Sequence, residues 1–320
     1  MNKITIIIPM YNEEKNLEQC IDNLKKQTNQ SFDVCFVDDG STDNTIKVLK
    51  NQLEKNIEFR YKIFSQKNSG AATARKKGVE LSNTPYISMI DCDDSVSSNY
   101  IEQFIQIIEK SDDVDIIIPN MKIEDNLKNW KDFNFYTKDV YLNPLHAVSN
   151  TFGGWKVHGI FCIRKLLFLE SYNLYNKYNL NNQNFINNDE VITRFNLLNA
   201  RNIVRSEAIY YYHYNEVSTT KRVNEKRYLM LRNTLIMKEA FADIPGLKKS
   251  VYSEIISSIW GTYKYYENNK LSLNNKDNWL KELKYSINQI SYRRIIFHLP
   301  LKAKVQFLIL KKKFLGKKYG

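Results

Sequence analysis

The stretch that decides the fold is FDVCFVDDGSTD, residues 32–43. Its first half, residues 32–37, is a short apolar run, which predicts a strand buried on both faces. The run ends at Asp38-Asp39, and Gly40 permits a tight turn. Ser41 or Asp43 can then cap a helix, which we expect over residues 43–53. The stretch therefore predicts a buried strand, a polar turn and a helix in succession.

The same order repeats on both sides of this stretch. Short apolar runs predict further strands, and helical spacing of apolar residues predicts helices between them. The strands are expected at residues 4–8, 59–64, 86–90 and 114–119, and the helices at 13–28, 71–81 and 101–109. This alternation predicts an α/β fold with a mainly parallel, doubly wound sheet. In such sheets ligands bind beyond the carboxyl ends of the strands.

The alternation decays after about residue 120. A hairpin is expected within residues 120–141 and a strand at 157–163, just after Gly153-Gly154-Trp155. A polar loop over 181–188 precedes a helix at 189–199 and a strand at 203–214. From residue 221 onward the pattern is helical.

An acidic cluster, Asp91-Cys92-Asp93-Asp94, follows the predicted strand at 86–90. Neighbouring carboxylates repel one another unless a cation neutralises them. Hard oxygen ligands suit Mg²⁺ or Mn²⁺, which commonly bridges protein carboxylates and substrate phosphates. An Asp-rich turn that caps the next helix is the alternative interpretation.

Two more polar clusters lie at predicted strand ends. Pro9-Met10-Tyr11-Asn12-Glu13 ends the first strand, where Tyr11 is suited to stacking on a base. Residues 68–75, Asn-Ser-Gly-Ala-Ala-Thr-Ala-Arg, open the helix at 71–81. Small residues there let the backbone approach a ligand, and Arg75 is suited to pairing with phosphate.

Together these motifs, in this order, resemble glycosyltransferase family 2, the inverting enzymes with a GT-A fold. The pattern is Pro9-x-Tyr11-Asn12, then residues 37–43, then Asn68-x-Gly70-x(3)-Ala74-Arg75-x(2)-Gly78, then Asp91-x-Asp93-Asp94. The resemblance is dense over residues 4–120 and thins to single motifs by about 220. It implies a catalytic domain over 1–220, with a nucleotide-sugar half (1–120) and an acceptor half (121–220). A helical region (221–320) follows.

The resemblance also implies roles for individual residues. The nucleoside pocket would be lined by Pro9, Tyr11, Glu13, Asp39 and Cys92, with Asn68 and Arg75 beside the base or diphosphate. Asp91 would face ribose and metal, and Asp93 would ligate the metal directly.

The family's catalytic base is an Asp just before a helix, often in a Glu-Asp pair. The matching stretch here is Asn187-Asn188-Asp189-Glu190, in which Asn188 replaces the usual Glu and Asp189 is the expected base. A helix N-cap is the alternative role for Asp189. Glu190, Trp155 and His213 are expected on the acceptor side. Packing in the core or in an edge strand is the alternative for Trp155 and His213.

The implied reaction moves a hexose or N-acetylhexosamine from a nucleotide diphosphate, UDP by family frequency, to an acceptor hydroxyl. Many bacterial relatives act on lipid-linked glycans of capsule or O-antigen. Two rivals remain: a nucleotidyltransferase, which would need a basic loop where Tyr11-Asn12-Glu13-Glu14 is acidic, and a non-catalytic nucleotide-sugar-binding module. A nucleic-acid partner is not expected, because the basic residues do not interleave with aromatics along one groove.

The formal net charge of +12 is concentrated near the end of the chain. Residues 283–320 contain ten Lys or Arg and no Asp or Glu. Leu301, Val305, Leu308 and Leu315 fall near one face of a helix, which Phe307, Leu310 and Phe314 widen. A basic amphipathic helix of this kind predicts binding to an anionic membrane surface. Packing on the catalytic domain or in a homodimer is the alternative.

Neither a signal peptide nor an apolar run long enough to cross a bilayer is present in the sequence. We therefore expect a cytoplasmic protein, peripheral at the inner face of the cell membrane.

Overall fold

The computed structural model describes residues 2–111, 113–180, 183, 185–215, 223–291 and 299–316. Tail residues Arg293, Arg294, Lys317 and Lys318 therefore lie outside the described part. The chain forms two compact units. The first contains residues 1–147, 156–174 and 195–215, and the second contains residues 148–155, 175–194 and 216–320. The second unit thus takes in two segments that precede residue 220, where we expected the catalytic domain to end.

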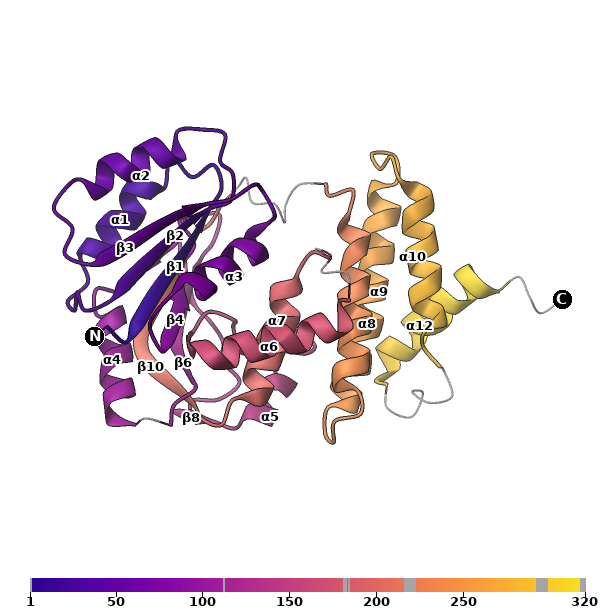
Figure 1. Cartoon of the computed structure of the whole chain (residues 1–320). Coiled ribbons are helices and arrows are strands. Elements are labelled where there is room, and N and C mark those ends of the chain that lie inside the picture. The colour runs from indigo at the N-terminus through magenta and orange to yellow at the C-terminus, as the bar shows by residue number, and fades with distance from the viewer. Residues whose placement is uncertain are drawn as a thin grey trace. The chain divides into compact units, whose positions relative to one another are not determined.

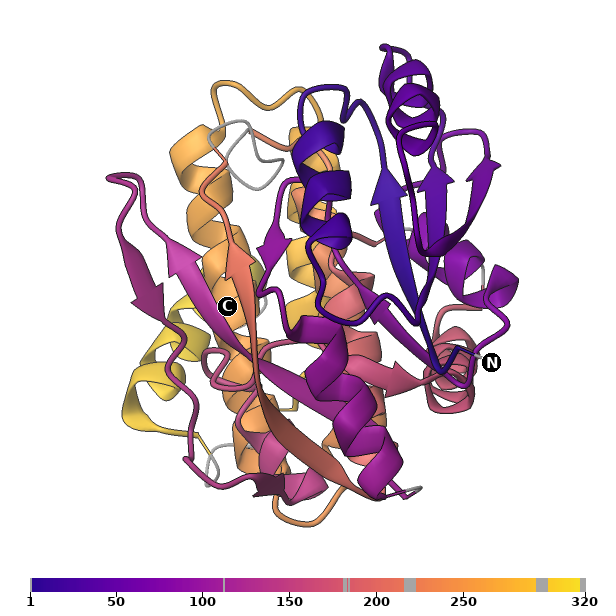
Figure 2. The ribbon, with the colours of Figure 1, turned by 90° about the vertical axis from the view of Figure 1, so that its left-hand side faces the viewer.

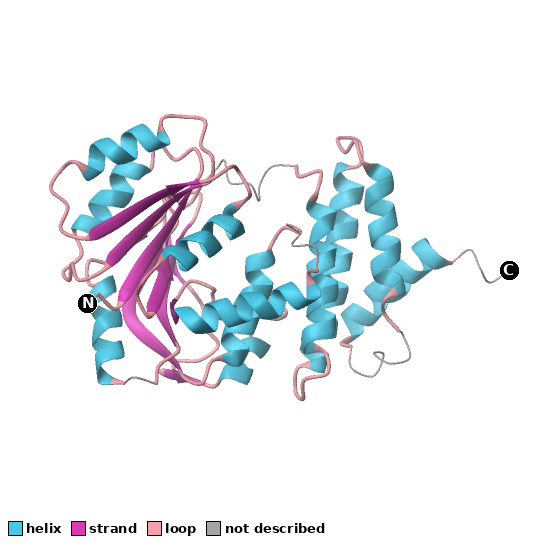
Figure 3. Ribbon diagram, viewed as in Figure 1, coloured by secondary structure: helices cyan, strands magenta, loops and turns pink. Residues whose placement is uncertain are grey.

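One sheet organises the first unit, and its long strands run parallel (Figures 1 and 3). The order β3-β2-β1-β4 joins Arg60–Ser65, Asp33–Asp38, Ile4–Met10 and Tyr86–Met89 in parallel register. The sheet continues through β9 (Cys162–Arg164), β6 (Ile116–Glu124), β10 (Ile203–Tyr212) and β5 (Ser95–Val96). β6 and β10 are parallel to each other and lie side by side in Figure 2. β9 and β5 are antiparallel to their neighbours, as are β7 (Trp130–Asp132) and β8 (Tyr141–Leu142).

Helices cover both faces of this sheet (Figure 1). Alternate residues of β1, Ile4, Ile6 and Ile8, join a core with α1 (Leu17–Lys25), α2 (Thr45–Leu53) and α4 (Tyr100–Lys110). The intervening Ile7 faces α3 (Ala71–Leu81). A Cβ at Gly78 of α3 would stand 2.4 Å from Ile7 Cγ2, so only glycine lets this helix lie so close to the sheet.

The remaining helices before residue 220 are α5 (Pro144–Ser149), α6 (Lys165–Tyr178) and α7 (Asn188–Asn199). Our sequence analysis did not predict α5 or α6. The strand expected over 157–163 is confined to the short β9, because residues 157–161 form bends and irregular chain rather than strand.

The second unit contains a helical group made of η1 (Arg227–Leu229), α8 (Met230–Phe241), α9 (Lys248–Asn269), α10 (Lys276–Asn288) and α12 (Leu301–Leu315). Trp279 of α10 is fully buried, with its ring stacked 5.6 Å from that of Tyr265. The Trp279 indole N–H donates to the Glu225 carbonyl at 3.1 Å. The expected α/β class with a C-terminal helical extension is confirmed.

The residues expected to form one apolar face on α12 occupy two different faces. Ala303, Phe307 and Leu310 are buried, and Lys313 pairs with Glu267 of α9 at 2.6 Å. Leu301, Val305 and Leu308, one turn apart in succession, are exposed by 78%, 48% and 49%. Across the described ranges, no helix has the length and apolar character that a membrane span requires.

Candidate active site

The predicted donor-side residues come from three neighbouring strands of the sheet. Tyr11 and Glu13 follow β1, Asp39 follows β2, and Asp91 and Asp93 follow β4. Because these strands are adjacent and parallel, in the order β2-β1-β4, the loops at their carboxyl ends meet at one edge. Asn12 links two of the loops, since its Oδ1 accepts from the Thr42 backbone N–H at 2.8 Å.

Two carboxylates of the acidic cluster have specific partners. One guanidinium nitrogen of Arg75, on α3, donates to both oxygens of Asp91 at 2.9 and 3.0 Å. The Asn215 side-chain amide donates to Asp93 Oδ2 at 2.9 Å. Both carboxylates are half-buried rather than buried. Their anionic oxygens are therefore accessible to a ligand from solvent. A site for a metal ion and phosphate needs oxygens of this kind.

The third carboxylate, Asp94, belongs to the scaffold. It is buried, and the Tyr210 hydroxyl donates to one of its oxygens at 2.6 Å while the His213 backbone N–H donates to the other at 2.9 Å. Burial raises the pKa of Asp94 to about 8, and the nearby Asp91 acts in the same direction. Of the three carboxylates, Asp91 and Asp93 remain as candidates for a cation. In the described part of the chain, no three His, Cys, Asp or Glu side chains gather as a metal site.

Glu13 shares the electrostatic surroundings of this cluster. Burial raises its pKa, and Asp93 and Asp91 raise it further, whereas the Asn16 amide, which donates to Glu13 at 2.7 Å, opposes them. Asp91 and Asp93 therefore repel the Glu13 carboxylate, and a bound cation would relieve that repulsion.

Asp39 holds the loop that precedes α3. Its two oxygens accept from the Gln66 side chain and from the backbone N–H groups of Ser69 and Gly70, each at 2.8 Å. A Cβ at Gly40, whose φ is +75°, would stand 2.8 Å from the backbone nitrogen of Asn68. Gly40 thus permits the close approach of two loops. The Asn68 side chain is exposed.

Pro9, near the end of β1, and Cys92, in the loop after β4, lie against each other. The Cys92 sulfur is 4.0 Å from the Pro9 carbonyl oxygen, and its side chain belongs to the apolar core. A contact of Cys92 with a nucleotide would therefore come from its backbone. Tyr11, by contrast, is 48% exposed, as a ring available for stacking must be.

His213 lies at the end of β10, also in the first unit. Its Nε2 is 2.8 Å from Ser95 Oγ, and its Nδ1 is 3.6 Å from a Glu124 oxygen. The Trp130 ring, from β7, meets the imidazole edge-on with 5.0 Å between ring centroids.

The expected base and two acceptor-side residues belong to the second unit. Asp189 and Glu190 lie in the first turn of α7, and Asp189 is exposed. Asn188, at the position of the family's usual Glu, is buried. Burial raises the pKa of Glu190, which Arg194 opposes and Asp189 reinforces.

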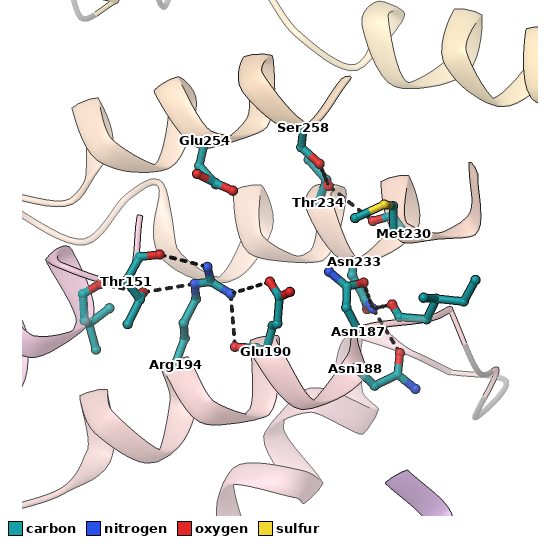
Figure 4. A network of polar contacts seen from close by, with 12 residues as sticks. Thr151, Asn187, Asn188, Glu190, Arg194, Met230, Asn233, Thr234, Glu254 and Ser258 are labelled. Atoms are coloured by element: carbon teal, nitrogen blue, oxygen red, sulfur yellow. Dashed lines mark hydrogen bonds and ion pairs between the residues drawn. The ribbon is translucent and has the colours of Figure 1, made fainter. Parts of the chain in front are cut away.

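Arg194 contacts both Glu190 and Trp155, and Figure 4 shows its contacts with Glu190 and Thr151. This buried guanidinium donates to Thr151 Oγ1 at 3.0 Å and to the Thr151 carbonyl at 3.1 Å. It lies 3.5 Å from the Glu190 carboxylate, and the Trp155 ring stacks 4.4 Å from it. Glu254 fixes the same loop by accepting from the Gly153 N–H at 2.8 Å. Trp155 thus makes a cation–π contact with Arg194. Neither the acceptor-side role nor the core-packing alternative for Trp155 predicted this contact.

Sequence reasoning missed several residues of these networks. Tyr210 and Asn215 were not singled out, because nothing local marks a partner more than a hundred positions away. The only signal for Arg194 is its i, i+4 spacing from Glu190 on a predicted helix.

Comparison with known proteins agrees with this geometry. Residues 5–173 match Glycosyl transferase family 2. Over 217 residues the chain is 29% identical to glycosyltransferase GlyG of Streptococcus pneumoniae serotype 4. The aligned region covers 65% of this chain and 70% of GlyG. Other curated relatives match about a third of this chain. The matched region spans between 15% and 41% of the length of those relatives.

Solved structures show the same fold at low sequence identity. S. aureus TarS 1–349 in complex with UDP-GlcNAc aligns over 99% of this chain and 93% of that one, with a TM-score of 0.67 and 18% identity. GalNAc-T7 with UDP, GalNAc and Mn²⁺ aligns over 90% and 58%, with a TM-score of 0.56 and 16% identity. The likeness to these structures shows that the chain has the GT-A fold. The chain belongs to glycosyltransferase family 2, as the family match over more than half its length shows.

Proposed function

We propose that this protein is an inverting, metal-dependent glycosyltransferase that uses a UDP-sugar. The observation that carries the proposal is the pair Asp91 and Asp93 at the end of β4, with Arg75 bound to one of them. Two anionic oxygen ligands beside one cationic group are what a metal-bound nucleoside diphosphate would need. The TarS complex with UDP-GlcNAc supports the same donor class.

The donor half, residues 1–120, supplies the nucleotide contacts. Tyr11 stacks on the base, and the loops carrying Pro9, Asp39, Asn68 and Cys92 form the walls of the nucleoside pocket. Glu13 completes the acidic side of that pocket. Arg75 pairs with the diphosphate. To do so, it gives up one of its two hydrogen bonds to Asp91.

Asp93, together with Asp91, would hold Mn²⁺ or Mg²⁺, and the phosphate oxygens would supply further ligands. A bound cation offsets the negative charge that develops on the departing nucleoside diphosphate. Two accessible carboxylates beside a buried Asp94, whose two oxygens already accept from Tyr210 and from the His213 backbone, support this assignment.

In the acceptor half, residues 121–220, Asp189 takes the proton of the acceptor hydroxyl as that oxygen attacks the anomeric carbon. A single displacement inverts the configuration and needs no enzyme nucleophile. Glu190 and Trp155 contact the acceptor, and His213 lies beside the diphosphate. The sugar is a hexose or N-acetylhexosamine.

We further propose that the acceptor is a lipid-linked glycan and that α12 binds an anionic membrane surface from the cytoplasmic side. The exposed stripe Leu301, Val305 and Leu308 is flanked by Lys302 and Lys312, which are also exposed. Apolar residues bordered by lysines fit the boundary between lipid tails and anionic headgroups.

The catalytic proposal is tested by UDP release from UDP-GlcNAc and other nucleotide sugars, with and without Mn²⁺, after a thermal-shift screen has selected the donor. We expect Asp189→Asn to retain donor affinity and to lower turnover by about two to four orders of magnitude, the range for a general base. Glu190→Gln is the matched control, one residue along the same helix turn. If Glu190→Gln is crippled and Asp189→Asn is not, the base is Glu190. If Mn²⁺ has no effect on wild-type turnover, metal dependence is wrong.

A further inference from the structure

The turn that leads into α7 has an unusual backbone. Ile186 and Asn187 both adopt the left-handed conformation, with φ of 61° and 54°. Neither is glycine, and for the β-branched Ile186 this conformation is a genuine outlier. Such a conformation persists only where the surroundings hold it. The residues after this turn, Asn188 and Asp189, begin the helix that carries the proposed base.

Asn233, on α8, supplies the hold (Figure 4). Its side chain is fully buried, and its amide nitrogen donates to the Ile186 carbonyl at 2.8 Å and to Asn188 Oδ1 at 2.9 Å. Asn187 Oδ1 is a third acceptor, at 3.2 Å. One side chain thus contacts three consecutive residues immediately before Asp189.

Tyr175 completes this cluster from α6. Its hydroxyl lies 2.7 Å from Asn188 Oδ1 and 2.8 Å from Asn233 Oδ1, and donates to one of these two oxygens. The Asn179 amide lies 3.2 Å from the same hydroxyl. The Asn233 side chain therefore presents its N–H groups to the turn and its oxygen to the Tyr175 hydroxyl, a division of donor and acceptor that an amide provides. An aspartate at position 233 would lose all three contacts that the amide nitrogen makes.

We propose that Asn233 is a positioning residue for Asp189: it holds the left-handed turn at 186–187 and so fixes where α7 begins and how its first turn presents the base. The inference rests on the proposed function, since it takes Asp189 as the base. It assigns to the C-terminal helical region a part in catalysis that no family motif in the sequence marks.

The test compares Asn233→Ala with Thr234→Val. Thr234 is the next residue of α8 and is equally buried, but its hydroxyl bonds Ser258 at 2.9 Å and the Met230 carbonyl at 3.2 Å instead of the turn. Both variants remove one buried polar group from the same helix. We expect Asn233→Ala to lower the turnover of UDP release from UDP-GlcNAc with Mn²⁺ by about 10- to 100-fold, as misplacement of a catalytic group by about 1 Å does. Thr234→Val should stay within about twofold of wild type, and calorimetry should give both variants wild-type affinity for UDP with Mn²⁺.

A double-mutant cycle separates positioning from a general loss of structure. If Asn233 acts through Asp189, adding Asn233→Ala to Asp189→Asn should lower the residual rate by less than about twofold, because the group that it positions is already gone. Full additivity of the two effects would overturn the inference.

Hydrogen exchange gives a readout that needs no substrate. The Glu190 N–H donates to the Asn187 carbonyl at 3.2 Å, so its exchange reports on the turn. We expect exchange at Glu190 to be at least tenfold faster in Asn233→Ala than in Thr234→Val. If Asn233→Ala does not fold, Asn233→Ser, which keeps one donor, is measured in the same way and should be intermediate.

Two further results overturn the inference: unchanged exchange at Glu190, or wild-type turnover in the Asn233 variant while Asp189→Asn is crippled. In both cases the proposed function stands. Wild-type turnover in Asp189→Asn would instead remove the base assignment and this inference together.

Discussion

Asp93 and Asp94 are adjacent residues with opposite surroundings. Asp94 is buried and accepts from Tyr210 and from the His213 backbone, whereas Asp93 is half-buried and has Asn215 as its named partner. Sequence spacing treats the two alike, because both follow the same strand. The family resemblance implies Asp93 rather than Asp94 as the metal ligand, and the structure adds the physical difference: Asp94 is buried, whereas Asp93 is accessible.

We predict that Asp93→Ala abolishes UDP release and removes the Mn²⁺ dependence of UDP binding, because the variant loses a direct metal ligand. Isothermal calorimetry with UDP, with and without Mn²⁺, measures the second effect. Asp132→Ala is the control, since that carboxylate is 86% exposed on β7. Unchanged Mn²⁺-dependent affinity in Asp93→Ala would eliminate the ligand role.

His158 predicts a pH dependence of stability. The imidazole is buried between Phe133 and Phe135, each 5.1 Å away between ring centroids, and its Nε2–H donates to the Pro119 carbonyl at 2.9 Å. Burial lowers the pKa of His158 from 6.5 to about 4. Between these values the unfolded chain binds a proton that the folded protein excludes. The free energy of unfolding should therefore fall as pH decreases through this window, by about 1.4 kcal/mol per pH unit.

Urea denaturation between pH 7 and pH 4 measures this slope, and His158→Gln should reduce it. His146→Gln is the matched control, because His146 is exposed and should leave the slope as it is. Parallel slopes in wild type and His158→Gln would show that the imidazole is protonated in the folded state.

At the scale of elements, two helical glycines predict opposite effects of one substitution. A Cβ at Gly78 of α3 would collide with Ile7 of β1, whereas a Cβ at Gly261 of α9 meets no atom within 4 Å among the described residues. Gly78→Ala should destabilise the protein by about 1–3 kcal/mol, as overpacking does. Gly261→Ala should stabilise it by about 0.5–1 kcal/mol, because alanine favours the helix. Urea denaturation of both variants measures the difference, and equal signs would contradict the packing of α3.

The elements that the sequence predicted well are those with a strong local period. The helix expected at 71–81 agrees with α3 at both ends, and the strand expected from residue 4 is β1. The predicted strand at 157–163 is longer than the observed β9. Val157 and Phe161 are apolar because they are buried, although they do not pair with another strand. α6 was missed, and α12 was given one apolar face instead of two. Tertiary contacts decide which side of a helix is buried, as they do for the fully buried Phe307 of α12. The periodicity of apolar residues alone does not predict those contacts.

The candidate site was predictable in part for the same physical reason. Residues that follow successive parallel strands must meet at one edge, so Glu13, Asp39 and Asp91 could be grouped from the sequence. Contacts between distant segments could not. Asp93 with Asn215 is one such contact, and Asn188 with Asn233 is another.

For the whole molecule, the net charge of +12 and the exposed stripe on α12 predict association with anionic lipid. We expect the full chain to float with phosphatidylglycerol liposomes at low salt and to be released at high salt, because exposed lysines are worth about 1 kcal/mol each near such a surface. Replacing Leu301, Val305 and Leu308 by Ser should abolish flotation. These residues are exposed, so the change spares the buried face that a deletion would remove.

Leu127→Ser, a substitution at a leucine exposed by 74% in the first unit, is the control and should still float. A wild-type protein that stays unbound at low salt refutes the membrane proposal. If the triple serine variant instead loses self-association in sedimentation, the stripe is a contact between two copies of the chain.

The interleaving of the two units has a consequence for synthesis on the ribosome. The carboxylate Asp94 emerges early, but its partner Tyr210 follows 116 residues later, and Asn233 follows Asn188 by 45. Neither unit is a continuous stretch of the chain, since each takes up segments on both sides of the other. Translation must therefore pass residue 233 before both networks can form. A nascent chain that stalls earlier would display the acidic loops without the contacts that arrange them, so donor turnover should begin only late in elongation.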